Sequence, residues 1–251
     1  MLGAVIGDII GSRFEADNHK SKEFDLFTQD SCPTDDSVMT LAVAKALVAS
    51  REDWSQLSKN AVKYMQEIGR QYPNCGYGGH FFYWIFSDDP QPYGSYGNGS
   101  AMRISPVGFA ADSIEQAKAL SQAVTEVSHD HPEGLKGAEA VAVAIFLART
   151  GSSRHEIRDY IDKNYYSMDF TLDQIREDYS FDVTCQGSVP QAFQAFFESQ
   201  DFEDAIRNAI SIGGDSDTIA AICGGLAQAY YGIPAPIRNQ AMAYLDDHLV
   251  E

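Results

Sequence analysis

The sequence predicts an all-helical domain built from many helices. Long runs of small and aliphatic residues recur at helical spacing, and no clear set of alternating apolar and polar residues indicates strands. Several of these runs follow directly on Asp, Ser and Thr, the residue types that cap helix N-termini. No Gly/Ser/Pro-rich linker or shift in composition divides the 251 residues. We therefore expect a single domain over residues 1–251.

The expected helices follow from the chain in order. The first, near residue 3, carries glycines four residues apart, which leaves one face bare and lets another helix or a ligand approach the backbone. A polar loop over 16–32 follows it. Further helices are expected where apolar residues recur at the helical period. They cover residues 38–50, 53–69, 81–86, 114–127, 138–148, 154–163, 190–199, 202–212, 219–231 and 238–249. We interpret the aromatic run 81–86 as a short core helix. The aromatic residues of 164–190 could stack on a base, but internal packing explains them more simply.

The charge and composition of the chain indicate which class of binding partner and which cellular compartment to expect. Only 18 Lys and Arg residues face 36 Asp and Glu, a net charge of −18, so we do not expect binding to duplex nucleic acid. The first ten residues are apolar, but Asp8 interrupts them and no basic region or cleavage site accompanies them. We therefore expect neither a signal peptide nor a membrane span. The four cysteines show neither a C-x-x-C pair nor zinc spacing, so we expect reduced thiols and a cytoplasmic protein. We also expect a monomer.

The segment Gly213-Gly214-Asp215-Ser216-Asp217-Thr218 places two carboxylates where a loop turns into an apolar helix. Paired glycines allow a tight bend or φ > 0. The polar residues could simply cap the helix. Two carboxylates beside a buried run need cations, however, and hard oxygen ligands favour Mg²⁺, Mn²⁺ or Ca²⁺. On this segment alone, a metal site and a plain helix cap are equally supported.

A second acidic segment, Pro33-Thr34-Asp35-Asp36-Ser37, repeats this chemistry near the other end of the chain. Asp36 and Asp215 are 179 positions apart (215 − 36). If the fold brings the two segments together, they supply about five or six oxygen ligands, enough for two divalent ions that share carboxylates. Asp8 and Glu15 share a helix face. Taken alone, they are more simply explained as a buried hydrogen-bonded carboxylate and a solvated helix end.

Two further segments suggest contact with a ligand. The glycine-rich stretch 93–103 can expose backbone N–H groups to an oxyanion, and Arg103 could add charge. It matches neither G-x-G-x-x-G nor a P-loop. His129 and His131 could bind zinc, but no third ligand lies at zinc spacing. A histidine that holds a loop or touches a substrate is the better interpretation.

Taken together and in order, these segments resemble the ADP-ribosylglycohydrolase family. That family includes hydrolases that remove ADP-ribose from arginine or serine and the dinitrogenase-reductase-activating glycohydrolase. The similar segments lie between residues 3 and 236, and their ordered set is far more specific than any one of them. They are 3–8 with Glu15, 34–36, 97–103, His129 with 137–138, and 213–218. Ser37, Ser100 and Ser128 depart from the common Thr, Gly and Thr of the family.

The resemblance implies an orthogonal bundle of helices and a metal-dependent hydrolase. Its reaction would cleave the glycosidic bond between ADP-ribose and an acceptor, either a protein side chain or a small molecule, and release ADP-ribose. The implied cofactors are two divalent ions, Mg²⁺ or Mn²⁺, bound by Thr34, Asp35, Asp36, Asp215, Asp217 and Thr218. The implied catalytic carboxylates are Asp35, Asp36 and Glu15, with acid and base unassigned. The implied substrate-binding residues are Gly97, Asn98, Gly99, Ser100, Met102, Arg103 and His129.

Two other interpretations stay open. The chain could be a two-metal phosphoesterase that acts on a nucleotide, or a catalytically inactive protein that keeps the fold and binds ADP-ribose. The intact set of carboxylates counts against the inactive protein. Release of ADP-ribose from a modified peptide, as opposed to release of phosphate from ADP-ribose, would separate the two enzymes.

Overall fold

The described chain is helical, as predicted. A computed structural model describes residues 1–250, and Glu251, the last residue of the predicted domain, lies outside the described residues. Within 1–250 the only β-type pairing is an isolated antiparallel bridge between Gly97 and Thr184. No helix among these residues is long and apolar enough to cross a lipid bilayer.

Most of the helices follow one another through short connections, and the two longest connections are residues 15–34 and 87–98. In chain order they are α1 (Leu2–Gly11), η1 (Ser12–Phe14), α2 (Asp35–Ala49), η2 (Trp54–Gln56), α3 (Leu57–Gly69), α4 (Gly79–Phe86), α5 (Gly99–Met102), α6 (Ser105–Ala110), α7 (Ile114–Thr125), α8 (Pro132–Arg149), α9 (Arg154–Asn164), α10 (Leu172–Ile175), α11 (Cys185–Phe197), α12 (Phe202–Ile210), α13 (Ser216–Tyr231), α14 (Ala235–Ala241), η3 (Met242–Tyr244) and α15 (Asp247–Val250).

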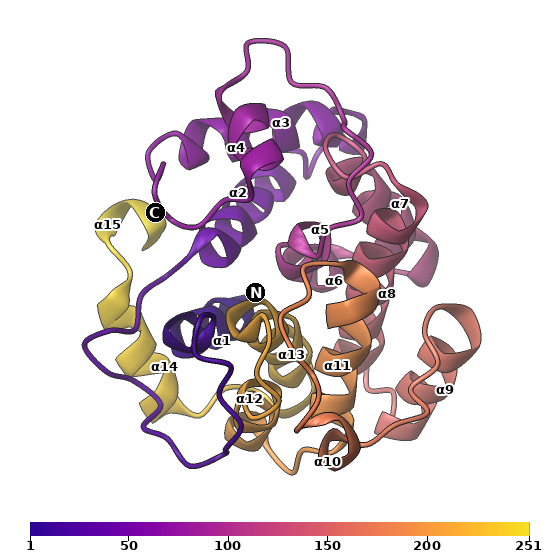
Figure 1. The fold of residues 1–251 in the computed structure, drawn as a ribbon. Helices are drawn as coiled ribbons and strands as arrows, with labels where there is room; N and C mark the ends of the chain where they lie inside the picture. The colour runs from indigo at the N-terminus through magenta and orange to yellow at the C-terminus, as the bar shows by residue number, and fades with distance from the viewer. Residues whose placement is uncertain (251) are drawn as a thin grey trace.

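The first helix and α13 form the closest helix pair of the fold. Figure 1 shows α1 and α13 side by side near the centre of the molecule, although they come from opposite ends of the chain. The bare glycine face of α1 is what permits this approach: a Cβ at Gly3 would lie 2.2 Å from the carbonyl oxygen of Gly224. The expectation that this face accepts another helix is confirmed, and α13 is the partner.

The remaining helices surround this pair. Helices α11, α12 and α8 pack against α13, and α2 packs against α1 and α3. In Figure 1, α2, α3 and α4 lie in the upper part of the molecule, and the yellow α14 and α15 lie on the left. The apolar residues of α13 from Ile219 to Ala227 are all buried. This arrangement directs the C-terminal end of α1 and the N-terminal ends of α2 and α13 toward one region.

Some predicted helix boundaries were wrong. Helix α8 begins at Pro132, because His131 caps it by accepting a hydrogen bond from the N–H of Glu133 at 3.1 Å. Helix α11 begins at Cys185, and Pro190 lies inside the helix and does not start it. The short helices α5, α6 and α10 were not predicted.

The predicted helix over 238–249 is instead three short elements, α14, η3 and α15. Helix α4 buries only one side. Phe81, Trp84 and Ile85 are buried, whereas Tyr83 keeps 74% of its surface exposed. The interpretation of residues 81–86 as a core helix is therefore correct for three of these six residues.

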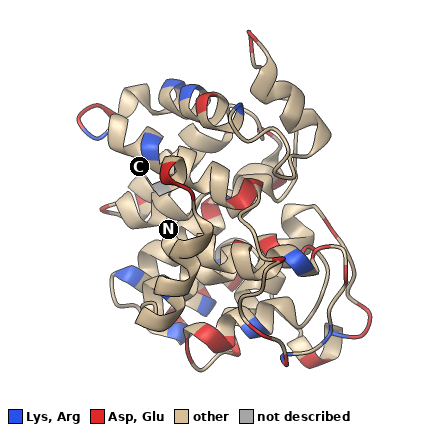
Figure 2. Ribbon diagram, turned by 90° about the vertical axis from the view of Figure 1, so that its left-hand side faces the viewer, with Lys and Arg blue, Asp and Glu red and all other residues tan. Residues whose placement is uncertain are grey.

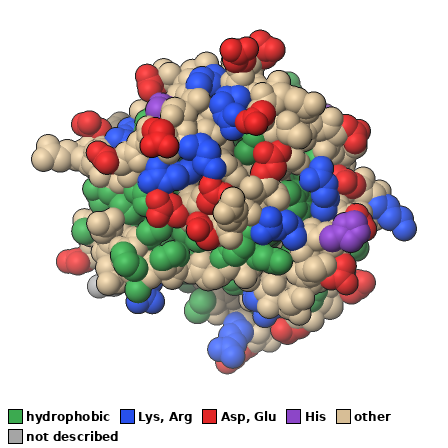
Figure 3. Space-filling model, turned by 90° about the horizontal axis from the view of Figure 1, so that it is seen from below, with side chains coloured by type: hydrophobic (Ala, Val, Ile, Leu, Met, Phe, Trp, Pro, Cys, Tyr) green, Lys and Arg blue, Asp and Glu red, His purple; other side chains and the backbone are tan. Residues whose placement is uncertain are grey.

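The surface agrees with the acidic composition. Figure 2 shows Asp and Glu positions spread over the helices and loops, with fewer Lys and Arg positions. On the face seen in Figure 3, Lys and Arg side chains are interspersed with Asp and Glu. That face does not present the continuous basic surface that a nucleic-acid backbone requires.

Candidate metal centre

Asp8 organises the start of α2 from within α1. Its side chain has no exposed surface, and it accepts hydrogen bonds from the N–H (2.9 Å) and Oγ1 (2.7 Å) of Thr34. The N–H of Ser37 (3.0 Å) and the Ser37 hydroxyl also donate to it. Thr34 in turn caps α2 by accepting a hydrogen bond from the N–H of Asp36 at 3.2 Å. These bonds fix the direction in which Asp36 points.

The paired glycines before α13 adopt the conformation that the sequence predicted. Gly213 and Gly214 have φ values of 70° and 73°, a region that residues with a side chain rarely occupy. The turn is held by Asn18, whose Oδ1 accepts a hydrogen bond from the N–H of Gly214 at 3.0 Å. This turn places Asp215 at the N-cap position of α13 and Asp217 in the first turn of that helix.

The two acidic segments converge, as expected. Carboxylate oxygens of Asp8, Asp36 and Asp217 lie within 4.8 Å of one another, and so do those of Glu15, Asp215 and Asp217. We call these the first and second acidic groups, and Asp217 belongs to both. The hydroxyl of Thr218 donates to Oδ2 of Asp36 at 3.3 Å and so links α13 to α2.

The carboxyl groups here have raised pKa values because they are buried beside one another. Burial, followed by repulsion from Asp217, raises the pKa of Asp36 well above its usual range. Burial, followed by repulsion from Asp215, does the same to the pKa of Asp217. No ion pair among the described residues includes a carboxylate of either group. Such a cluster must bind protons or cations to remain buried.

The donor atoms fit a hard divalent cation. Oδ1 of Asp36 is buried and has no hydrogen-bond partner within the described chain. The atoms that converge are carboxylate oxygens, the ligands that Mg²⁺, Mn²⁺ and Ca²⁺ prefer. A carboxylate common to both acidic groups suits two neighbouring ions. The junction of α1, α2 and α13 is therefore a candidate metal centre.

The other predicted metal and catalytic residues lie around these groups. Asp35 is half-buried and belongs to neither group, and its N–H donates to the carbonyl oxygen of Cys75 at 2.9 Å. Burial, then repulsion from Asp8 and Asp215, raises the pKa of Asp35 to about 8. The hydroxyl of Thr34 is engaged with Asp8 and with the N–H of Asp36, as described above.

A pocket of about 400 Å³ opens above the acidic groups. Its walls bring together the predicted glycine-rich stretch, the predicted histidine and several aromatic side chains. The lining includes Glu15, Asp35, Asp36, Asp215, Asp217, Thr218, Gly97, Asn98, Gly99, Met102, Arg103 and His129, together with Phe81, Tyr93, Phe181 and Val183. The predicted catalytic and substrate-binding residues thus gather in one place, with Ser100 as the exception.

Three of the predicted substrate-binding residues also have structural contacts. Ser100 is fully buried and donates to the carbonyl oxygen of Gly134 at 2.9 Å, so it lies behind the pocket wall. Nδ2 of Asn98 donates to Oδ2 of Asp215 at 2.7 Å and so orients a carboxylate of the second acidic group. Nδ1 of His129 lies 2.9 Å from the Ser128 hydroxyl. Burial and the nearby Arg103 lower the pKa of His129 well below its usual range, so the ring is neutral.

Arg103 is a buried cation in the wall of the pocket. It has no exposed surface, and its guanidinium carbon lies 5.0 Å from the centre of the Phe81 ring. Nη2 donates to the Ser128 hydroxyl at 2.7 Å, but Nε and Nη1 have no hydrogen-bond partner within the described chain. Burial lowers its pKa to about 10. Arg103 therefore places positive charge at the pocket, although its side chain has no surface exposed to solvent.

The aromatic wall was not predicted. The sequence interpretation assigned residues 81–86 to the core and favoured internal packing for the aromatic residues of 164–190. Phe81 is buried as predicted and also lines the pocket, together with Tyr93 and Phe181, and Phe181 keeps 53% of its surface exposed. No local pattern distinguishes Phe181 from the less exposed aromatic residues near it in the sequence, such as Tyr179.

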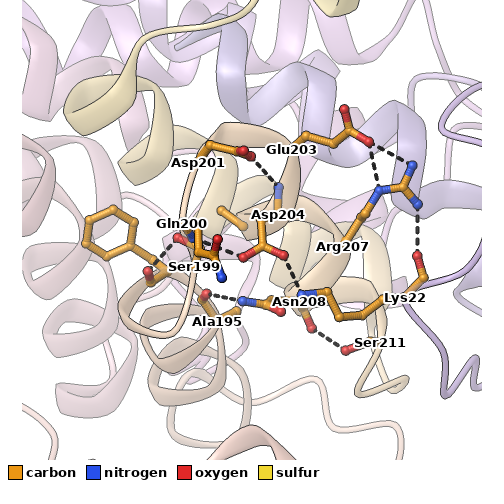
Figure 4. Close-up of polar contacts among 12 residues, drawn as sticks. Lys22, Ala195, Ser199, Gln200, Asp201, Glu203, Asp204, Arg207, Asn208 and Ser211 are labelled. Carbon is orange, nitrogen blue, oxygen red and sulfur yellow. Dashed lines mark hydrogen bonds and ion pairs between the residues drawn. The ribbon is translucent and has the colours of Figure 1, made fainter.

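Helix α12 holds the segment 16–24 that follows Glu15. Nη1 of Arg207 donates to the carbonyl oxygens of Lys22 and Phe24, each at 2.8 Å. Figure 4 shows Arg207 held in turn by Glu203, and Lys22 paired with Asp204. The segment is thus fastened to the helix that leads into the Gly213-Gly214 turn, which keeps Glu15 beside the second acidic group.

Comparison with known proteins places this geometry in one family. The model of the ADP-ribosylglycohydrolase family matches residues 1–250. Human ADP-ribosylhydrolase ARH3 is 25% identical, over 93% of this chain and 84% of the human protein. The ADP-ribosylarginine hydrolase Tri1 of Pseudomonas putida (strain GB-1) is 26% identical, over 93% of this chain and 70% of that protein. A solved ADP-ribosylglycohydrolase-related protein complex has the same fold, with a TM-score of 0.70 at 22% identity, over 97% of this chain and 93% of the other.

Proposed function

The chain belongs to the ADP-ribosylglycohydrolase family and is an enzyme of that family, and we propose that it hydrolyses the glycosidic bond between ADP-ribose and an acceptor. The observation that carries the proposal is the pocket that is lined by Glu15, Asp36, Asp215 and Asp217 of the two acidic groups and by the glycine-rich stretch with His129. A pocket of this size and mixed lining suits a nucleotide-like ligand. The partner would be an ADP-ribosylated protein or a small ADP-ribose conjugate.

We propose two divalent cations, Mg²⁺ or Mn²⁺, as cofactors. Asp36, Asp217 and Thr218, with Asp8 behind them, would hold one, and Glu15, Asp215 and Asp217 would hold the other. Thr34 and Asp35 would complete the set, Thr34 by orienting Asp8 and Asp36. When bound, the cations would supply the positive charge that orients a sugar diol and offsets developing negative charge.

The reaction breaks the bond between C1″ of the distal ribose and the acceptor atom. The oxygen of a water molecule bonds to C1″, the acceptor atom leaves with the electron pair of the broken bond, and a carboxylate takes a proton from the water. Asp35 is the carboxyl group of the pocket that lies outside both acidic groups. Because its side chain lines the pocket, Asp35 could take a proton from the water or give one to the acceptor. Asp36 and Glu15 complete the proposed catalytic set.

The pocket wall would hold the rest of ADP-ribose. Gly99 carries no side chain, so a phosphate oxygen could approach its N–H group closely, whereas the N–H of Gly97 donates to the Ser95 hydroxyl at 3.2 Å. His129 is neutral and nearly buried, and its Nε2 faces Gly99. Met102 lies on the same wall, 3.8 Å from the Thr218 hydroxyl. Phe81 and Tyr93 add flat surfaces for the nucleoside.

The proposal is tested with an ADP-ribosylated peptide incubated with Mg²⁺, Mn²⁺ or EDTA, followed by chromatography of the products. We expect release of free ADP-ribose that EDTA abolishes and added metal restores. Release of phosphate or AMP from ADP-ribose, with the peptide linkage intact, would instead identify a nucleotide phosphoesterase. Binding of ADP-ribose without turnover of any substrate would identify an inactive member of the fold.

A further inference from the structure

His129 turns one ring nitrogen toward the interior of the protein and the other toward the pocket. Nδ1 lies 2.9 Å from the Ser128 hydroxyl and 3.5 Å from Nη2 of Arg103. Nε2 has no hydrogen-bond partner among the described residues, although the side chain is nearly buried. A Cβ at position 99 would lie 3.3 Å from Nε2, so Gly99 leaves this nitrogen open to the pocket. The position of the imidazole proton therefore decides whether a ligand meets a donor or an acceptor there.

The hydrogen bonds behind the ring determine where that proton lies. Nη2 of Arg103 donates to Oγ of Ser128 at 2.7 Å, and a guanidinium can only donate. Within residues 1–250, Oγ of Ser128 has no other hydrogen-bond partner than Arg103 and His129. The hydroxyl hydrogen of Ser128 therefore has one acceptor, which is Nδ1. Because the ring is neutral and Nδ1 accepts, the proton of the imidazole lies on Nε2.

Two aromatic rings hold the imidazole in place. The centres of the Phe81 and Tyr93 rings lie 5.9 Å and 5.6 Å from the centre of the His129 ring. The N–H of Tyr93 also donates to the carbonyl oxygen of Ser128 at 3.2 Å, which joins the glycine-rich stretch to the segment before α8. Packing thus restricts the direction of Nε2, and the hydrogen bond from Ser128 determines which nitrogen is protonated.

We propose that Arg103 and Ser128 are positioning residues that hold His129 as the tautomer protonated on Nε2, so that Nε2–H donates to an oxygen of the bound ligand. That the ligand is ADP-ribose rests on the proposed function, whereas the tautomer follows from Arg103 and Ser128 alone. The three residues form a chain in which each group donates to the next. Hydrogen bonds in such a chain polarise and strengthen one another.

The charge at the inner end of this chain favours an anionic oxygen at its outer end. No ion pair among the residues that the structure describes includes Arg103. Its positive charge is therefore left to act on the pocket. A phosphate oxygen accepts a stronger hydrogen bond than a neutral oxygen does, and it would also be attracted by the guanidinium. A ligand group that can only donate would leave Nε2–H without a partner, which costs binding free energy.

The tautomer is tested by 15N NMR of the imidazole nitrogens in the wild-type protein at neutral pH, with Mg²⁺ and without ligand. The chain has six histidines, and the signals of His129 are those that disappear in His129→Gln. We expect the chemical shift of an unprotonated nitrogen for Nδ1 and that of a protonated nitrogen for Nε2. Added ADP-ribose should move the Nε2 signal more than the Nδ1 signal. A proton on Nδ1 would overturn the inference and leave the proposed hydrolysis untouched.

The positioning role is tested by the affinity for free ADP-ribose, measured by calorimetry. Ser128→Ala should weaken binding about fivefold, because the proton and the tilt of the His129 ring are no longer fixed. Ser128→Thr keeps the hydroxyl and should bind within about twofold of the wild type. In a His129→Leu background, Ser128→Ala should have no further effect, because Ser128 acts through His129.

Ser121→Ala is the matched control for the loss of a buried serine hydroxyl. Ser121 is fully buried, its hydroxyl has no hydrogen-bond partner in the described part of the chain, and it does not line the pocket. Its affinity for ADP-ribose should equal that of the wild type. Melting temperatures of all variants show whether each one folds, and if Ser128→Ala does not fold, the NMR spectrum of the wild type decides.

Two binding results would also overturn the inference. Wild-type affinity in Ser128→Ala would show that the hydroxyl does not position the ring. An equal loss of affinity from Ser128→Ala in the wild type and in His129→Leu would show that Ser128 acts by another route. If the wild type binds no ADP-ribose, the proposed function fails, and the NMR spectrum still decides which nitrogen of His129 carries the proton.

Discussion

Gly7 of α1 lies directly against the carbonyl oxygen of Ala220 in α13, so closely that a Cβ at Gly7 would stand 2.0 Å from that oxygen. A Cβ at Gly11 would likewise stand 2.6 Å from the Cα of Asp217. Asp8 sits on α1 between these two contacts. The close approach of two helix backbones is therefore what brings Asp8 and Asp217 within reach of one cation.

Gly7→Ala should destabilise the protein, because the new methyl group meets backbone atoms that a side-chain rotation cannot move. We expect a loss of about 2–3 kcal/mol in the free energy of unfolding, measured by urea denaturation. Gly78→Ala is the control, since a Cβ there meets no atom within 4 Å, and its effect should stay within about 0.5 kcal/mol. A stable Gly7→Ala protein would contradict the close contact.

The same helix pair shows how far the sequence could predict the fold. Glycines four residues apart indicated a bare face on the first helix, but any apolar helix could have filled it, so α13 was not foreseeable as the partner. The predicted helix boundaries were wrong where a capping contact determines the first residue of the helix, as His131 does at the start of α8. In the C-terminal stretch, 238–249, no glycine or proline marks the break between α14 and α15, so a continuous helix was predicted there.

Asp36→Asn and Asp217→Asn should each abolish activity while leaving the metal-free protein as stable as the wild type or more so. Each change removes one buried negative charge from a repelling cluster. Mn²⁺ should raise the melting temperature of the wild type. At a Mn²⁺ concentration one hundred times the Kd, binding adds about 2.7 kcal/mol to the free energy of unfolding. Both variants should lose most of that gain.

The control for these variants is Asp88→Asn, an exposed carboxylate outside the pocket, which should keep both activity and the response to Mn²⁺. Melting curves with and without Mn²⁺, combined with the peptide assay, provide the measurement. Full activity in the Asp36→Asn, Asp217→Asn double variant would refute the assignment of the site.

The acidic residues of this site could be found from the sequence because they occur in two compact segments. The sequence could not show which of these carboxylates lie close enough to one another to bind the same cation. Asp8 was interpreted as a structural carboxylate, and its hydrogen bonds to Thr34 and Ser37 agree with that. It also joins the first acidic group, because α1 packs so closely on α13. Asp35, predicted as a ligand, lies outside both groups, although it lines the same pocket.

Arg207→Met should impair catalysis from a distance. Removal of the guanidinium frees the carbonyl oxygens of Lys22 and Phe24, so segment 16–24 would no longer be fastened to α12. We expect faster amide hydrogen exchange in residues 16–32 and a fall of about tenfold in kcat/KM, because Glu15 loses its fixed position. Arg238→Met, at an exposed position on α14, should change neither quantity. Normal exchange together with a large loss of activity would show that Arg207 acts by another route.

The metal-free protein should become less stable as pH rises from about 4 to about 8. Burial raises the pKa of Asp8 to about 6 and that of Asp35 to about 8, from 3.8 in both cases, and raises those of Asp36 and Asp217 as well. The folded state therefore binds more protons than the unfolded state in this range, so the free energy of unfolding falls as pH increases. Each group contributes up to about 1.4 kcal/mol per unit of its pKa shift.

Divalent metal should reverse this dependence, because metal binding requires ionised carboxylates and becomes tighter as protons are lost. Melting temperatures recorded between pH 5 and pH 8, in EDTA and in excess Mn²⁺, would test both slopes. In Mn²⁺ the melting temperature should hold steady or rise over this range, while in EDTA it should fall. Parallel slopes in the two conditions would mean that protons and metal do not compete for these carboxylates, and the metal centre would have to be placed elsewhere.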